Sequence, residues 1–150
     1  MGPVLRVQEG AQAQVTLFVD TSVWSLAFRR DAPARSPEVQ ALRHALGSGQ
    51  EIATTGLVLQ ELLQGFSGPR AREQIIASFS ALPLISPDRD DHINAADLRN
   101  RCRRGGAQVG TIDAILAQLC LRYDLTLLST DKDFAAIAEY AALRIWKAAS

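Results

Sequence analysis

Residues 15–19 read VTLFV, and the chain continues with Asp20, Thr21 and Ser22. A short apolar run rich in β-branched and aromatic residues is typical of a strand that is buried on both faces of its sheet. The acid and the hydroxyl residues that follow provide N-cap chemistry for a helix, which we expect over residues 23–28. This stretch predicts a strand buried on both faces that ends on a carboxylate and leads into a helix.

A second stretch repeats this arrangement near the end of the chain. Residues 126–129 read TLLS and predict a strand, Asp131 follows it, and residues 132–140 predict a helix. Because strands alternate with helices, we predict an α/β fold, a three-layer α/β/α sandwich with a central parallel sheet of about four to five strands. The other expected strands cover residues 51–54, 84–85 and 143–146. One further helix is expected to begin near Ser36 and to be stopped by Gly47 and Gly49, and the remaining helices are expected over residues 57–66, 69–82, 88–104 and 111–123.

The overall composition limits the number of domains and the arguments for a partner. A chain of 150 residues fits one domain, which we place at residues 15–150, and it can bury a core without a disulfide. Residues 1–14 are polar and without period, so we expect a flexible N-terminal tail. The formal net charge is zero, so a nucleic-acid partner can be argued only from local clusters of charge.

Cysteine usage and hydropathy indicate the compartment. Cys102 and Cys120 fit neither a zinc spacing nor a CxxC motif, so we expect buried free thiols in a reducing compartment. The start of the chain lacks the apolar centre of a signal peptide, and no run of about 18 apolar residues occurs. We therefore expect a soluble, cytoplasmic protein that does not bind membranes.

Four acids occupy positions that suit a shared site. Asp20 and Asp131 follow predicted strands, which places them at the carboxyl edge of a parallel sheet. Glu61 interrupts the apolar run LVLQELL, and Asp113 lies in the first turn of the apolar helix TIDAILAQLC. Singly, each has an ordinary explanation, as a helix cap, a favourable first-turn charge or a solvated helix edge. Together, converging carboxylates suit Mg²⁺ or Mn²⁺, and such ions can activate a water against a phosphodiester.

Four motifs in series carry a resemblance to a known family. VDTSVW (19–24), LQELLQG (59–65), GTIDAILAQLC (110–120) and LLSTDKDFAAIA (127–138) resemble the successive motifs of PIN-domain proteins, and above all toxins of the VapC family. The resemblance implies a PIN-like parallel α/β/α sandwich with Mg²⁺- or Mn²⁺-dependent endoribonuclease activity, often on tRNA or ribosomal RNA. It also implies a cognate VapB-type antitoxin and a homodimer.

The resemblance assigns roles to the residues that match the motifs. Asp20, Glu61, Asp113 and Asp131 match the catalytic acids, with Asp20 and Asp113 as metal ligands and the other two acting directly or through water. Asp133 is implied as an auxiliary acid. The auxiliary hydroxyl residues are Ser22 and Ser129, and Ser129 stands where the family usually has threonine.

Two arginine clusters are candidates for contact with RNA phosphates. Arg29 and Arg30 follow the first predicted helix, and the second cluster lies before the Asp113 motif. The strongest candidates from the two clusters are Arg29, Arg30, Arg103 and Arg104, and the second cluster also holds Arg99 and Arg101. A solvated helix face is the ordinary alternative for the second cluster. We expect exposed histidines without an acid–base role and tryptophans in the core or at a dimer contact; these residues are His44, His92, Trp24 and Trp146.

Other functions remain open on the sequence alone. A non-toxin PIN-domain nuclease would share the same acids. A metal-dependent binding module without catalysis is another alternative, because DTSVWS resembles the D-x-S-x-S adhesion motif, although Trp24 stands where that motif has serine. A phosphotransferase or receiver domain would use Asp20 as nucleophile, but Ser22 occupies the place of the second acid in its D-x-D pair.

Overall fold

Four short parallel strands form the centre of the computed structural model, which describes residues 15–29, 31–32 and 35–149. The predicted tail, residues 1–14, lies outside the described residues, as do Arg30, residues 33–34 and Ser150. The sheet order is β2-β1-β3-β4, and every neighbouring pair is parallel. The strands are β1 (Leu17–Val19), β2 (Ile52–Ala53), β3 (Thr126–Leu128) and β4 (Arg144–Ile145).

The sheet has a topological switch point between β1 and β3. The chain leaves β1 to build β2 on one side and later returns to place β3 on the other side. Val19 pairs with Leu128, so the residues that follow them, Asp20 and Ser129, lie side by side at the carboxyl edge. In open parallel sheets ligands bind in the crevice at such a point.

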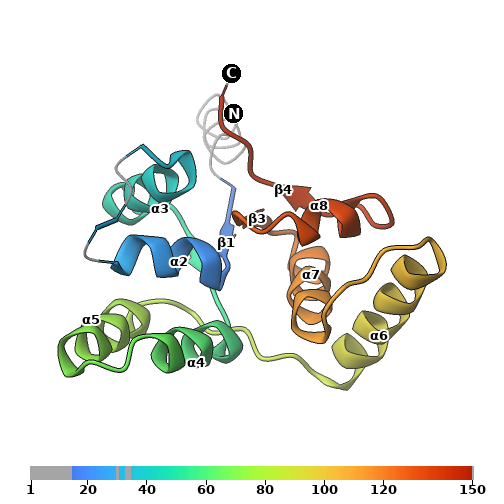
Figure 1. The fold of residues 1–150 in the computed structure, drawn as a ribbon, viewed down its shortest axis with the longest axis horizontal. Coiled ribbons are helices and arrows are strands. Elements are labelled where there is room, and N and C mark those ends of the chain that lie inside the picture. The colour runs from blue at the N-terminus through green and yellow to red at the C-terminus, as the bar shows by residue number, and fades with distance from the viewer. Residues whose placement is uncertain (1–14, 30, 33–34, 150) are drawn as a thin grey trace, which may run out of the picture.

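Helices cover both faces of the sheet, which confirms the predicted three-layer architecture (Figure 1). One side carries α2 (Thr21–Phe28), α3 (Pro37–Ser48), α4 (Gly56–Gly65) and α5 (Pro69–Ser80). The other side carries α6 (Arg89–Arg104), α7 (Thr111–Tyr123) and α8 (Asp133–Ala138), with α6 packed along α7.

The core is built on the central strands and on α7. Every residue of β1 and β3 is buried, as the apolar runs predicted, and α7 buries six of its side chains, including Cys120. Burying one large apolar side chain stabilises the fold by roughly 2 kcal/mol. Trp24 is 1% exposed and packs on Phe79 with ring centroids 4.8 Å apart, whereas Trp146 is half-buried. Both cysteines are buried and free, as expected.

Several predicted boundaries are wrong by one to four residues. The strand predicted from residue 15 begins at Leu17, and the helix predicted from residue 23 begins at Thr21 because the Asp20 side chain accepts a hydrogen bond from Ser22 N. The predicted strand at residues 84–85 is a single parallel bridge between Thr54 and Leu84, at the edge of the sheet beyond β2.

The predicted helix over residues 132–140 covers only Asp133–Ala138. Of the two glycines predicted to stop α3, Gly47 lies inside the helix and Gly49 is the C-cap, where φ is 77°. Along the described ranges, no helix combines the length and the apolar character that a membrane crossing requires.

An ion pair between the buried Asp91 and the exposed Arg122 fastens α6 to α7, and the sequence did not predict it. Asp91 is 1% exposed and accepts hydrogen bonds from Asp88 N at 2.9 Å and from Arg122 Nη1 at 2.6 Å. Burial by itself raises the pKa of Asp91, but the hydrogen bonds from the Asp88 backbone, Arg122 and Gln118 outweigh it and lower that pKa below its ordinary value.

Replacing Asp91 with alanine is expected to destabilise the protein by about 3 kcal/mol, because a helix cap and a charge-assisted hydrogen bond are lost together. Thermal unfolding would show this as a fall in Tm of roughly 10 °C. The contribution is present above the ordinary pKa of 3.8 and is lost as acid protonates the carboxylate, so the two proteins should converge at low pH. Asp90→Ala, in the same helical turn but exposed, is the control and should cost under about 1 kcal/mol; equal losses would contradict the ion pair.

Candidate active site

Asp20 is the buried acid at the centre of the site. It ends β1, caps α2 and is 5% exposed. Its Oδ1 accepts hydrogen bonds from Ser22 N at 3.1 Å and Ser22 Oγ at 2.6 Å, and its Oδ2 accepts one from Ser129 Oγ at 2.8 Å. Both oxygens are therefore held in fixed directions by the two serines that the family resemblance singled out.

The same two hydroxyls position the loop that follows β3. Ser22 Oγ accepts a hydrogen bond from Thr130 N at 3.0 Å, and Ser129 Oγ accepts one from Asp131 N at 2.9 Å. Each serine thus donates to Asp20 and accepts from the loop backbone. The position of the next acids along the chain consequently depends on Asp20.

Three further carboxylates gather at this edge. Asp131 Oδ1 accepts a hydrogen bond from Asp133 N at 2.9 Å, which turns the chain into α8. Asp113, Asp131 and Asp133 each offer an oxygen, and these oxygens all lie within 4.8 Å of one another. Asp113 is half-buried and the other two are exposed. The structure therefore brings Asp133, predicted as auxiliary, as close as Asp131.

Glu61 lies outside this compact group of three. It is exposed on α4, and its Oε1 accepts a hydrogen bond from Thr21 Oγ1 at 2.8 Å. This side chain lies on the solvent edge of an amphipathic helix, which is the ordinary explanation that the sequence offered for Glu61 taken alone. Thr21 was not singled out from the sequence, although its place next to Asp20 was the available signal.

The acids share one negative field. Burial raises the pKa of Asp113 to about 6, together with the charges of Asp131, Asp133, Asp20 and Glu61 in that order. Burial also raises the pKa of Asp20, opposed by its hydrogen bonds to the serines. The four other predicted acids therefore all act on Asp113, including the two outside the compact group.

The donor set fits a hard divalent cation. Oxygen ligands about 2.1 Å from Mg²⁺ lie at most about 4.2 Å apart, so the three clustered oxygens come within range of one ion after small side-chain rotations. The nearby Cys120 thiol is buried, and burial with the charge of Asp20 raises its pKa, which keeps it neutral and unsuited to bind metal. Carboxylate oxygen without thiolate favours Mg²⁺ or Mn²⁺.

The predicted basic residues lie in different environments. Arg29 pairs with Asp31 at 3.1 Å and is exposed, and Arg30 lies outside the described residues. Arg101 donates to Tyr140 O at 2.9 Å, and Arg104 is exposed. Arg99 and Arg103 line a cavity that includes Gly110, the N-cap residue of α7. Both histidines, His44 and His92, are exposed, as expected.

Comparisons with known proteins identify the class of fold and site. The model of the PIN domain family matches residues 17–140. The chain is 27% identical to VapC ribonuclease Mb1587 of Mycobacterium bovis over 130 residues, which cover 85% of this chain and 96% of that protein. It is 31% identical to ribonuclease VapC23 of Mycobacterium tuberculosis over 119 residues, which cover 76% and 90%. The chain belongs to the PIN-domain family and, within it, to the VapC ribonucleases.

Solved structures show the same fold. DNA-bound VapBC from Salmonella typhimurium matches with a TM-score of 0.67 at 19% identity, over 88% of this chain and 97% of that one. VapC20 of Mycobacterium tuberculosis, described as a sarcin–ricin loop cleaving toxin, matches with a TM-score of 0.61 at 21% identity, over 81% and 94%. The predicted PIN-like sandwich is confirmed by these likenesses.

The raised pKa of Asp113 makes this acid costly in the metal-free protein. With its pKa at about 6 in the fold and 3.8 ordinarily, the folded state loses stability as pH rises between these values. Asp113→Asn should therefore stabilise the protein in EDTA at neutral pH by about 1 kcal/mol after solvent screening, or roughly 3 °C in Tm. The gain should vanish near pH 4. Asp97→Asn, exposed on α6, should leave Tm unchanged; a destabilised Asp113→Asn would contradict the electrostatic account.

Proposed function

We propose that this chain is a Mg²⁺- or Mn²⁺-dependent endoribonuclease that acts as the toxin of a toxin–antitoxin pair. The observation that carries the proposal is the convergence of Asp113, Asp131 and Asp133 at the switch point of the sheet, with Asp20 behind them. The ribonuclease names of the sequence relatives and the VapBC assemblies among the structural neighbours support it. Ribosomal RNA and tRNA are the substrate classes to test first.

Each acid has a proposed task in the reaction. Asp113 and Asp20 keep the roles of metal ligands that the family resemblance implies, and Asp131 and Asp133 would join Asp113 in holding the ion because their oxygens cluster with it. Glu61 would bind the ion directly or through water. When bound, the ion would activate a water and neutralise charge that develops on the phosphodiester. Ser22 and Ser129 orient the Asp20 carboxylate and keep the loop of Asp131 in place.

RNA cleavage by the purified protein is expected to require Mg²⁺ or Mn²⁺ and to stop when EDTA is added, because every proposed ligand is a carboxylate. Asp113→Asn should lower the cleavage rate by at least about 100-fold, as expected for loss of a group that acts on the transition state. Gel assays on tRNA, ribosomal RNA and a sarcin–ricin loop oligonucleotide measure this, with Asp97→Asn as the matched control. Cleavage that persists in EDTA would sink the metal mechanism.

We also propose that the protein is a cytoplasmic homodimer and that a VapB-type antitoxin inhibits it. The metal-free site concentrates negative charge around Asp113. A partner that inserts an arginine would replace the missing positive charge, hold carboxylates bidentately and block the approach of RNA. We expect this partner to wrap the helices near Glu61 and to direct a basic side chain toward the acids.

Inhibition by the cognate partner is therefore expected to depend on its basic residues. Changing these residues singly to alanine should weaken inhibition of RNA cleavage by roughly 10-fold or more at one position, the loss of a charge-assisted hydrogen bond pair. Cleavage assays with increasing partner measure the effect. Alanine variants of neutral residues in the same segment serve as controls, and full inhibition by every basic-residue variant would show that blockage of the groove alone restrains the toxin.

A further inference from the structure

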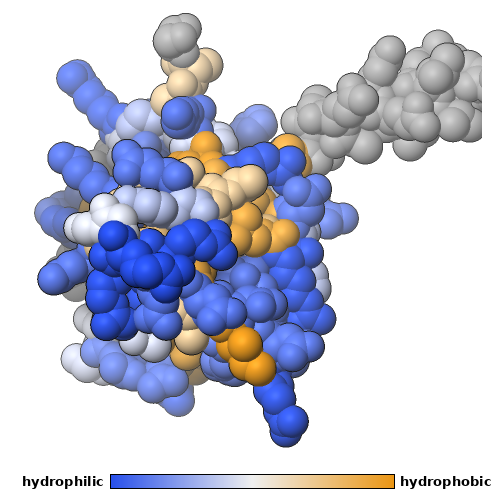
Figure 2. All heavy atoms as spheres, turned by 90° about the vertical axis from the view of Figure 1, so that its right-hand side faces the viewer, coloured by the Kyte–Doolittle hydropathy of each residue, from blue (hydrophilic) through white to orange (hydrophobic). Residues whose placement is uncertain are grey.

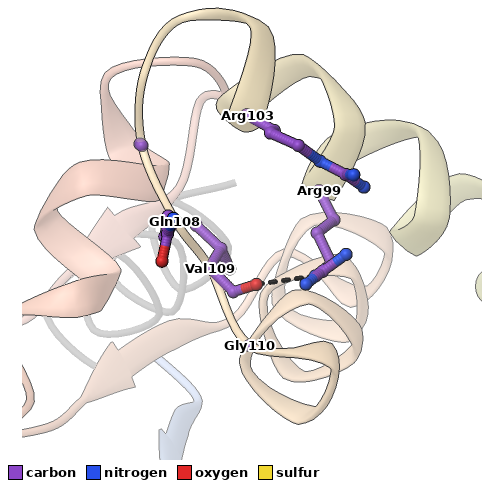
Figure 3. A pocket seen from close by; sticks show the side chains of 6 residues that line it. Arg99, Arg103, Gln108, Val109 and Gly110 are labelled. Carbon is purple, nitrogen blue, oxygen red and sulfur yellow. Dashed lines mark hydrogen bonds between the residues drawn. The ribbon is translucent and has the colours of Figure 1, made fainter.

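A hollow lined by arginines borders the acidic site. Its volume is about 460 Å³, and it lies between the C-terminal half of α6 and the loop that leads to α7 (Figure 3). The view that faces α6 shows strongly hydrophilic side chains gathered beside an apolar strip (Figure 2). The lining residues of the hollow are Arg99, Arg103, Ala107, Gln108, Val109 and Gly110.

Two arginines extend from successive turns of α6 on the same side of the helix (Figure 3). Arg99 Nε donates to Val109 O at 2.7 Å, which fixes the guanidinium against the loop. Arg103 Nη2 donates to Asn100 Oδ1 at 2.7 Å. Each contact uses one donor of a guanidinium that has five, so both side chains keep donors for a further acceptor.

The positive charge in the hollow has no counter-ion. None of the lining residues is acidic, and neither arginine forms an ion pair within the described part of the chain, whereas Arg29, Arg122 and Arg144 each pair with an aspartate. Like charges four residues apart on a helix repel one another. An anion placed between the two guanidinium groups would remove this repulsion and accept charge-assisted hydrogen bonds.

Stabilisation of the helix end is the ordinary explanation for arginines here, and it covers only part of the observation. The last turn of α6 holds Arg101, Arg103 and Arg104, which oppose the negative end of the helix dipole. Arg99 lies outside that turn and is bound to the loop instead. The pairing of Arg99 with Arg103 across one hollow is therefore not explained by the dipole.

Gly110 connects the hollow to the acids. It lines the hollow and caps α7, and a Cβ built on it would lie 3.9 Å from Asp113 Oδ2. An RNA strand carries one phosphate on every nucleotide, so a strand held at the acids has other phosphates nearby. A positively charged hollow beside the proposed cleavage site is therefore placed to receive another phosphate of the same strand.

We propose that the hollow between Arg99 and Arg103 is a subsite for an RNA backbone phosphate that flanks the phosphate to be cut. The inference rests on the proposed ribonuclease function. It adds that the RNA strand runs from the acidic site toward the hollow beside α6. Arg103 and Arg99 bind the flanking phosphate through their free guanidinium donors, and Gln108 supplies a neutral polar group at the rim. Arg104, which does not line the hollow, makes no such contact.

Binding of a fluorescent single-stranded RNA oligonucleotide of mixed sequence tests the subsite. The parent protein carries Asp113→Asn to prevent cleavage, and anisotropy is measured in Mg²⁺ and again in EDTA at several salt concentrations. Adding Arg103→Gln should weaken binding about 10-fold and reduce the salt slope by about 0.7, the value for one single-strand phosphate contact. Arg104→Gln, at the same helix end and with the same change of charge, should weaken binding by less than about 2-fold. Equal losses from the two variants would overturn the subsite.

A second variant guards against a loss caused by unfolding. Arg103→Lys keeps the charge but lacks the planar fork, and it gives up only a contact with the exposed Asn100, so binding should fall several-fold while the thermal melting curve stays that of the parent. Unchanged binding would count against a bidentate phosphate contact. Inorganic phosphate separates a free anion from RNA: it should compete only at millimolar concentration, and displacement at micromolar concentration would assign the hollow to a free anion.

The two proposals fail in different ways. If RNA is cleaved in a metal-dependent manner and bound by the parent, but Arg103→Gln binds like Arg104→Gln, the subsite is wrong and the ribonuclease function stands. If the protein carrying the native Asp113 neither cleaves RNA nor binds it, the ribonuclease function is wrong and the subsite falls with it.

Discussion

The hydrogen bond from Ser129 Oγ to Asp20 Oδ2, 2.8 Å long, joins the carboxyl ends of the two central strands. Asp20 is 5% exposed, and an isolated carboxylate at that depth would cost several kcal/mol or take up a proton. The serine hydroxyls replace the lost water and also accept from the loop backbone. If Asp20 were not held in this way, the loop would lose its anchor, and Asp131 and Asp133 would no longer be fixed opposite Asp113.

This arrangement places function and stability in opposition. Asp113 raises the free energy of the metal-free fold at neutral pH, since its burial and the charges of the neighbouring acids lift its pKa to about 6. The opposing stabilisation comes from the apolar strands directly behind the site, where Phe18, Val19, Leu127 and Leu128 are all fully buried. Short strands that are completely enclosed allow the chain to present polar groups at their ends without exposing the sheet.

The sequence predicted those parts of the structure in which local pattern and tertiary packing agree. The bounds of α7 and the burial of β1 on both faces follow from dense apolar runs that only burial satisfies. The contact of Glu61 with Thr21 beside Asp20 could not be predicted so well, because it depends on which edge of α4 meets α2. Asp133 lies in the acidic group because the Asp131 side chain accepts a hydrogen bond from Asp133 N and so turns the chain. The spacing of the two acids in the sequence does not reveal this turn.

The distribution of charge could not be predicted from the sequence either, because the formal net charge of zero conceals one negatively and one positively charged region. Fields in salt solution fade over about 10 Å, so an approaching strand responds to the nearest region and not to the total. Around Asp113 the metal-free protein repels phosphate, and around Arg99 and Arg103 it attracts phosphate. In the proposed function, an RNA strand would therefore meet its first favourable contact at the α6 side. A divalent cation among the acids would then reduce the negative charge around Asp113, so that the metal and the arginines would bind phosphates of the same strand.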